Sequence, residues 1–313
     1  MSAHGLPLAQ GLPVAIVDAC LRNGGGGSPT AVLDETPLSD EQRRRVPVLA
    51  GTSHAVFVSP SGAQHSGAAV SLRFFTSEGE LPACGHGTVA ALAFLAARAG
   101  GEEYRTLLHA SGRVFEGWSL RDGTLDETPE GTSARTSEGT SVDAAFEPGP
   151  VDLREPTENE CGAVLAALGI TRDTLAPGAA VASVGRPRLL VPLTTRSALA
   201  ALTPDSGALR AACDRLGLLG CYVYSVPEPT GRAAARMFAP SIGVPEDIAN
   251  ANSTACLAAH LAGRGITRIA VDMGDSLGSP ATITATAQPG PAGPVIHLGG
   301  AARLTRVVRL NDQ

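Results

Sequence analysis

A cysteine and a histidine lie two residues apart in the segment Pro82-Ala83-Cys84-Gly85-His86-Gly87-Thr88, where glycines flank the histidine on both sides. Thiols and imidazoles readily exchange protons near neutral pH, so this pair could act chemically on a bound molecule. The alanine- and leucine-rich residues that follow predict a helix over about 88–98. The start of such a helix presents unpaired backbone N–H groups, which attract an anion such as a carboxylate.

The same arrangement occurs a second time about half the chain later, where Arg236-Met237-Phe238 repeats the strand ending Arg73-Phe74-Phe75. Asp247 follows Arg236 by eleven residues, as Cys84 follows Arg73, and a second small-residue helix is predicted over about 254–262. A repeat of this length indicates two similar halves, so we expect two helix N-termini to face one ligand. The residues expected to bind that ligand are Gly85, Gly87, Thr88, Ala251, Asn252 and Ser253.

Four residues are candidates for proton transfer on that ligand: His54, Cys84, His86 and Asp247. A carboxylate that faces a thiol or an imidazole across a ligand makes a proton-transfer pair. Plainer alternatives exist, because Cys84 also fits a small buried hydrophobe and Asp247 also fits a helix N-cap. His54 begins an apolar strand, a position that by itself indicates no function. We expect no metal ion, because a cysteine and a histidine two residues apart do not easily share one ion in such a turn.

The overall composition excludes several classes of function. The 313 residues carry a net charge of -6 and a pI near 5.7, which argues against nucleic acid or an anionic membrane as a partner. All 24 basic residues are arginine, and the absence of lysine excludes a pyridoxal-phosphate Schiff base and a P-loop. The six cysteines have no CxxC spacing, so neither zinc nor a disulfide framework is indicated. With no recognisable signal peptide and no stretch of ~20 apolar residues, we predict a cytoplasmic protein with a small-molecule partner and no cofactor.

Many short strands around two repeated helices predict an α+β fold with two pseudo-symmetric domains. The first half is expected over residues 1–140 and the second over 141–300, joined by the Gly-, Ser-, Thr- and Glu-rich stretch 121–149. Gly299-Gly300 predicts a turn, after which a last strand, near 301–313, is expected to pack back on the first half.

Several motifs taken together resemble one known family along nearly the whole chain. They are Gly27-Ser28-Pro29-Thr30-Ala31-Val32, Cys84-Gly85-His86-Gly87-Thr88, Phe238-Ala239-Pro240 with Gly243 and Glu246-Asp247, and Leu298-Gly299-Gly300-Ala301. The sequence resembles the PhzF family of phenazine biosynthesis, which has a diaminopimelate-epimerase-like fold. The resemblance implies two domains, each a mixed barrel-like sheet around a central helix, with the site in the cleft between them. It also implies a cofactor-independent isomerase or epimerase of small amino or carboxylic acids, and it leaves a homodimer open.

The chain departs from the family pattern at the residues that carry the chemistry. Ser53-His54-Ala55 stands where the phenazine enzymes have Ser-Glu-Thr, so the resemblance places His54 at the position of the proton-shuttling glutamate. Asp247 stands where epimerases of this fold have their second cysteine, which disfavours racemisation by two thiols. An imidazole with an ordinary pKa near 6.5 can take and return a proton at neutral pH, so His54 is expected to be the base.

These features favour an isomerase that shifts a double bond by proton transfer in a small unsaturated acid, with His86 and Asp247 assisting and Cys84 as an alternate acid. A narrower similarity is to the isomerase of 4-alkyl-proline formation for lincomycin-type antibiotics, which implies a 4-alkylidene-proline-type substrate. Two alternatives are an amino-acid epimerase or racemase of the same fold and a non-catalytic homologue that binds a small acid.

Overall fold

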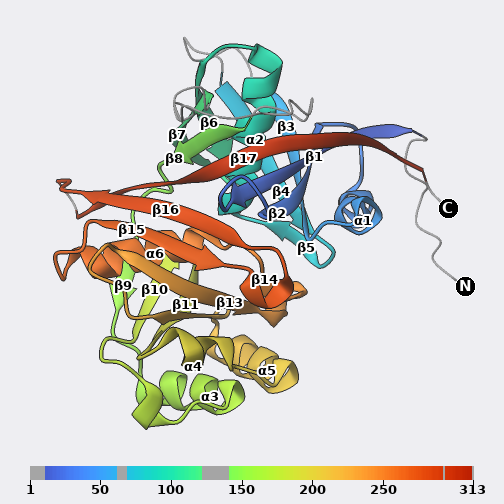
Figure 1. The fold of residues 1–313 in the computed structure, drawn as a ribbon. Helices are drawn as coiled ribbons and strands as arrows, with labels where there is room; N and C mark the ends of the chain where they lie inside the picture. The colour runs from blue at the N-terminus through green and yellow to red at the C-terminus, as the bar shows by residue number, and fades with distance from the viewer. Residues whose placement is uncertain (1–10, 62–68, 122–140, 292, 312–313) are drawn as a thin grey trace, which may run out of the picture.

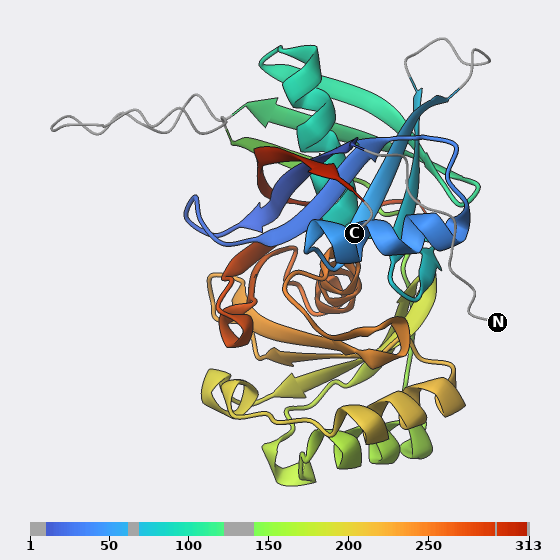
Figure 2. The ribbon, with the colours of Figure 1, turned by 90° about the vertical axis from the view of Figure 1, so that its right-hand side faces the viewer.

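The computed structural model describes residues 11–61, 69–121, 141–291 and 293–311. The chain forms two stacked halves, each of which wraps β-strands around one helix (Figure 1), and this confirms the predicted α+β fold. A turn of the view by 90° shows α2 and α6 inside their own halves, with α1, α3 and α5 on the outside (Figure 2). In the ranges given above, no helix combines the length and the apolar character that a membrane span requires.

The strands of the first half close a ring in which each strand pairs with the next and the last returns to the first. In ring order they are β1 (Leu12–Leu21), β2 (Ser28–Asp34), β3 (His54–Ser61), β4 (Ala69–Thr76), β6 (Glu103–Ala110), β7 (Arg113–Arg121), β8 (Val142–Phe146) and β17 (Val295–Leu310). Helix α2 (Gly85–Ala99) runs inside this ring, and its many alanines let the surrounding strands approach closely. Outside the ring lie α1 (Asp40–Ala50) and the short β5 (Gly79–Leu81).

The second half builds a similar sheet around helix α6 (Ala251–Ala262). Its strands are β9 (Asp152–Arg154), β10 (Ala180–Val184), β11 (Arg186–Leu193), β12 (Cys221–Ser225), β13 (Arg232–Ala239), β15 (Arg268–Met273) and β16 (Ala281–Gln288), with the short β14 (Val244–Asp247) beside β13. Three helices cover its outer face: α3 (Glu158–Leu168), α4 (Arg196–Ala200) and α5 (Ser206–Leu216). Single 3-10 turns lie at Arg172–Thr174, Pro240–Ile242 and Asp275–Leu277.

The repeat seen in the sequence is a repeat of topology. In the first half, β4 leads through β5 and α2 to β6, which is parallel to β4. In the second half, β13 leads through β14 and α6 to β15, which is parallel to β13. Both helices begin three residues before the predicted starts, because Cys84 and Asn250 hold the N-cap positions. Glycine and asparagine in the first turn have weak helix propensity, and burial between the halves overrides it.

Strand β17 joins the two halves. Its residues Val295–Gly299 pair with β16, and Ala301–Leu310 pair with β1, so one strand belongs to both sheets. The predicted turn at Gly299-Gly300 is therefore wrong. A Cβ on Gly299 would lie 2.5 Å from the carbonyl oxygen of Ala144, so glycine is present because two strands approach closely, not because the chain turns.

A buried carboxylate also ties the halves together. Asp272 of β15 accepts two hydrogen bonds from Arg232, at 2.8 and 2.7 Å, and one from Thr282 at 2.9 Å. Arg22, from β1 of the first half, lies 3.4 Å from the same carboxylate and donates to the carbonyls of Met273 and Ala281. Asp272 is thus the centre of a network that spans both sheets.

We expect Asp272→Asn to lower the free energy of unfolding by roughly 2–3 kcal/mol, because Arg232 loses its acidic partner and Arg22 loses one of two. Asp34→Asn is the matched control, since Asp34 pairs with Arg98 on the surface and is 63% exposed. Such exposed pairs contribute at most about 1 kcal/mol. Urea unfolding of both variants gives the comparison, and equal losses would contradict the structural role of Asp272.

Candidate active site

A cavity of about 40 Å³ lies where the first turns of α2 and α6 meet. From the first half it is lined by His54 and by the segment Leu81–His86. From the second half it is lined by residues of β10, β11, β14 and the start of α6. The small volume restricts the occupant to a compact molecule.

The close approach of the two helix starts depends on Gly85. A Cβ on Gly85 would lie 2.5 Å from Cβ of Ala251 and 3.0 Å from the backbone nitrogen of Asn252. The first turn of α2 has no side-chain cap, whereas Asn250 caps α6 by accepting a hydrogen bond from the Ser253 N–H at 2.9 Å. Two positive helix ends therefore meet at one point, and the uncapped N–H groups of α2 are available to an anion.

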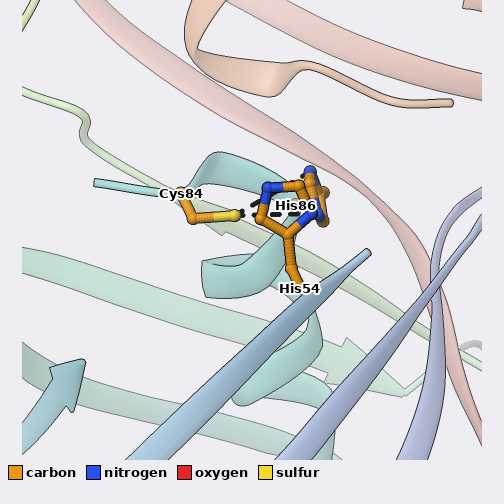
Figure 3. Close-up of side chains that lie close together, drawn as sticks. All are labelled: His54, Cys84 and His86. Atoms are coloured by element: carbon orange, nitrogen blue, oxygen red, sulfur yellow. Dashed lines mark hydrogen bonds between the residues drawn. The ribbon is translucent and has the colours of Figure 1, made fainter. Parts of the chain in front are cut away.

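His86 lies between a thiol and a carboxylate, as Figure 3 shows for the thiol. Its Nε2 is 3.6 Å from Sγ of Cys84, and its Nδ1 is 4.0 Å from Oδ2 of Asp247. All three side chains are buried. The order thiol, imidazole, carboxylate is the arrangement in which an imidazole activates a thiol and a carboxylate orients the imidazole.

The pKa values of the two histidines of the site are shifted in opposite directions. Burial by itself would lower the pKa of His86, but the negative charges of Cys84 and Asp247 and a backbone hydrogen bond to Ala249 raise it to about 9. The pKa of His54 is instead well below its usual value, because burial and the charge of His86 both disfavour its protonation. At neutral pH, His86 is an imidazolium and His54 is a neutral imidazole.

His54 begins β3 and is held from both sides. Its Nδ1 is 2.9 Å from Oγ of Ser53, and its ring meets that of His86 edge to face, with centroids 4.4 Å apart (Figure 3). The sequence-based expectation of an ordinary pKa near 6.5 is wrong for this residue, because the fold removes it from water and places a cation beside it. His54 is therefore a weaker base than its residue type suggests.

Asp247 comes from the other half, at the end of β14. Its Oδ2 accepts a hydrogen bond from Nδ2 of Asn250 at 2.9 Å, and its Oδ1 accepts one from the Ala249 N–H at 3.4 Å. Burial raises the pKa of Asp247, and the charge of His86 opposes that increase. These hydrogen bonds fix the carboxylate of Asp247 beside His86, where it can orient the imidazole and favour its protonated form.

The residues predicted to bind a ligand divide into two groups. Gly85 and Asn252 line the cavity. Gly87 makes room for Cys84, since a Cβ there would lie 2.9 Å from Sγ, and Ala251 packs against Gly85. Thr88 donates from Oγ1 to the carbonyl of Cys84 at 2.9 Å, and Ser253 is fully buried beside Arg188.

Three polar residues of the lining were missed from the sequence: Arg186, Arg188 and Asn250. Asn250 could have been found as a polar residue three positions before Ser253, the spacing of a helix cap. The two arginines stand in the strand sequence Arg186-Pro187-Arg188, where no local pattern indicates that they face a cavity.

His54, Cys84 and His86 could hold a metal ion by donor type and by distance. One donor atom from each lies within 4.8 Å of the other two, and all three residues are buried. Two histidines and a cysteine are ligands that zinc accepts. The sequence argument that Cys84 and His86 cannot easily share an ion fails on geometry, because the first helical turn brings both side chains to the same side.

The fold and the site together define an α+β protein with titratable side chains between two pseudo-symmetric halves. A model of the family described as phenazine biosynthesis-like protein, PhzC-PhzF, matches residues 17–305. The chain belongs to this family, and it is an enzyme of the isomerase type.

Relatives and solved structures agree with this assignment. An uncharacterized isomerase of Deinococcus radiodurans is 30% identical over 90% of this chain and 89% of its own. The uncharacterized isomerase YddE of Escherichia coli O157:H7 is 29% identical over 75% of this chain and 74% of its own. A predicted epimerase from Pseudomonas aeruginosa has the same fold, with a TM-score of 0.76 at 23% identity over 97% of this chain and 100% of its own. A PhzF-family protein from Bacillus anthracis has a TM-score of 0.75 at 16% identity, again over 97% of this chain and 100% of its own.

We expect Gly85→Ala to reduce turnover by at least about 10-fold, because the added methyl group forces the two helix starts apart and displaces Cys84 from His86. The unfolding midpoint should fall as well, since overpacking of this kind costs about 1–3 kcal/mol. The measurements are initial rate and thermal unfolding.

Gly162→Ala is the matched control, because a Cβ at Gly162 of α3 would meet no atom within 4 Å. Alanine there should leave turnover unchanged and raise stability by roughly 0.5–1 kcal/mol. If Gly85→Ala behaved like Gly162→Ala, the close meeting of the helix starts would have no part in catalysis.

Proposed function

We propose that this protein is a cofactor-independent isomerase that shifts a double bond in a small unsaturated carboxylic or amino acid by moving a proton. The observation that carries the proposal is the clustering of proton carriers: donor atoms of His54, Cys84 and His86 lie within 4.8 Å of one another beside the cavity. A substrate placed against this cluster would lose and regain its proton on one face, which is what a double-bond shift requires.

The pair of Cys84 and His86 supports a complete cycle. In this cycle Cys84 first passes its proton to His86 and then takes a proton from one carbon of the substrate, which becomes an enolate-like anion. The imidazolium of His86 then delivers a proton to the second carbon, and the Cys84 thiol returns its own proton to His86 across 3.6 Å. This assignment replaces the His54 base expected from the sequence, because the lowered pKa of His54 makes it the weaker acceptor.

The negative charge that develops on the substrate would be stabilised by the helix starts. The uncapped N–H groups of α2 point to the cavity side, and the start of α6 abuts them through Ala251 and Asn252. Fixed donors and dipoles of this kind are worth a few kcal/mol in buried sites, since they need no rearrangement as charge develops. His54, neutral and fixed by Ser53, keeps the ring of His86 in place.

The arrangement supports isomerisation better than epimerisation. Inversion at a carbon needs proton carriers on two opposite faces of the substrate, and Asp247 is the titratable residue that the second half contributes to the cavity lining. Its oxygens are engaged with Asn250, Ala249 and His86 rather than free toward the cavity. An epimerase is therefore the second candidate, and labelling separates the two reactions.

For the substrate we propose a 4-alkylidene-proline-type acid from antibiotic biosynthesis. The similarity of the altered motifs to 4-alkyl-proline isomerases supports this choice, and so does the small size of the cavity. A compact cyclic acid brings its carboxylate and its conjugated carbons within a few ångströms of each other, which suits a site whose anion-binding and proton-carrying groups are adjacent.

The test is incubation of a 4-alkylidene-proline with the enzyme in heavy water, followed by NMR. We expect deuterium at the newly formed allylic carbon and none at the α-carbon of recovered substrate. Cys84→Ser should slow this incorporation by about 100-fold or more, because a hydroxyl is a far weaker acid than a thiol and keeps its proton near neutral pH. Cys161→Ser, on α3 away from the cavity, is the control. Deuterium at the α-carbon of both stereoisomers would indicate epimerisation and overturn the proposal.

The pH dependence tests the charge of His86. Because its pKa is raised to about 9, the imidazolium is present below that pH and is lost as the pH rises through it, so kcat/KM should fall above about pH 9. Asp247→Asn removes one of the charges that raise the pKa of His86, and its alkaline limb should move to lower pH. Asp34→Asn, on the surface, should leave the profile unchanged. An identical alkaline limb in Asp247→Asn would contradict the coupling.

A further inference from the structure

Arg188 of β11 is a buried cation, and no carboxylate among the residues that the structure describes pairs with it. It is 1% exposed and lines the same cavity as Cys84 and His86. Its Nη2 donates to the carbonyl of Arg186 at 2.7 Å, and its Nη1 donates to Oγ of Ser253 at 3.3 Å. Its Nε is buried and has no hydrogen-bond partner among the described residues. A guanidinium has five N–H groups to donate, so most of this capacity is unused.

Other arginines with little exposure in this protein are treated differently by the fold. Arg236 makes a two-pronged pair with Glu246, at 2.9 and 2.8 Å. Arg43 pairs with Glu35 and Asp40. In the part of the chain that the structure describes, Arg188 forms no ion pair. It therefore differs from comparable arginines in its partners rather than in its burial.

The surroundings of Arg188 make its isolation more costly. An unpaired charge removed from water is unfavourable by several kcal/mol. Ser253 lies in the first turn of α6, so Arg188 also lies near the positive end of a helix dipole, which disfavours a second positive charge. Asp247 does not compensate, because its oxygens are engaged with Asn250, Ala249 and His86. An anion that enters the cavity would relieve all of these penalties.

We propose that Arg188 binds the carboxylate of the substrate and is the residue that makes the site specific for acids. The planar guanidinium matches a carboxylate with two parallel hydrogen bonds, and its unused N–H groups supply the donors. The uncapped start of α2 lies across the same cavity and adds to the positive potential. This inference rests on the proposed function to the extent that the ligand occupies the cavity beside Cys84 and His86.

The role predicts an unusual combination of effects for Arg188→Met. Methionine fills a similar volume and removes the isolated charge, so the thermal midpoint should stay the same or rise. Ligand specificity should be lost at the same time. Arg236→Met is the matched control: it leaves Glu246 unpaired, so its thermal midpoint should fall while ligand specificity is kept.

The probes are pyrrole-2-carboxylate, a flat cyclic acid that resembles a delocalised enolate, and pyrrole-2-carboxamide, its uncharged counterpart. Calorimetric titration of the wild-type enzyme should show tighter binding of the acid than of the amide. In Arg188→Met the affinity for the acid should fall by about 10- to 100-fold, and the affinity for the amide should change little. Arg188→Lys keeps the positive charge but loses the planar guanidinium that makes two parallel hydrogen bonds. It should therefore retain only part of the preference for the acid over the amide.

The outcomes separate this inference from the proposed function. If Arg188→Met and Arg188→Lys both kept the preference for the acid, the role of Arg188 would be overturned, whatever the enzyme catalyses. If Arg188→Met lowered the thermal midpoint as Arg236→Met does and left the preference intact, Arg188 would be a structural residue. If the preference depended on Arg188 but the wild-type enzyme exchanged no proton in heavy water, the proposed isomerase would fail and the acid-binding site would stand.

Discussion

The contact between the first turns of α2 and α6 determines what this site can do. Each helix start carries about half a positive charge, and Gly85 lets the two approach so closely that a single methyl group there would contact Ala251. Like charges held this near repel each other. The negative groups that lie in the same place are those of Cys84 and Asp247. Because the charges of Cys84 and Asp247 are gathered at this contact, they overcome the effect of burial and raise the pKa of His86.

Two arrangements of charge coexist within the cavity. On one side, His86 is flanked by Cys84 and Asp247, so its charge is balanced before any ligand arrives. On the other side, Arg188 is buried and has no counter-ion within the described part of the chain. The balanced side can hold and move a proton, and the unbalanced side lacks a partner that only a ligand supplies. A buried, unpaired arginine makes the folded protein less stable than an apolar side chain at the same place would. Such a loss of stability is common at binding sites.

The two halves share a topology but not a chemistry. The unit of strand, short strand, helix and parallel strand is the same around α2 and around α6. Yet the first copy places Cys84 and His86 at the cavity, whereas the second places Asp247 and Asn250 there. A symmetric scaffold with symmetric thiols would act on two faces of a carbon. Here the divergence places the thiol of Cys84 and the imidazole of His86 at the start of α2, and the carboxylate of Asp247 in the second half.

The sequence by itself determined the α+β class, the repeated unit, the neighbouring pair Cys84 and His86 and the family resemblance, because these are patterns over a few consecutive residues. It also named His54 and Asp247, although through a repeat and a family position rather than through any sign of their surroundings. Only the tertiary structure decided that Arg188 lines the cavity, that Thr88 donates to the carbonyl of Cys84 and that β17 passes straight through Gly299-Gly300. The reason is physical. Spacing reveals neighbours along the chain, but burial and the charges that shift a pKa come from segments distant in sequence, and these are set only when both halves have packed together.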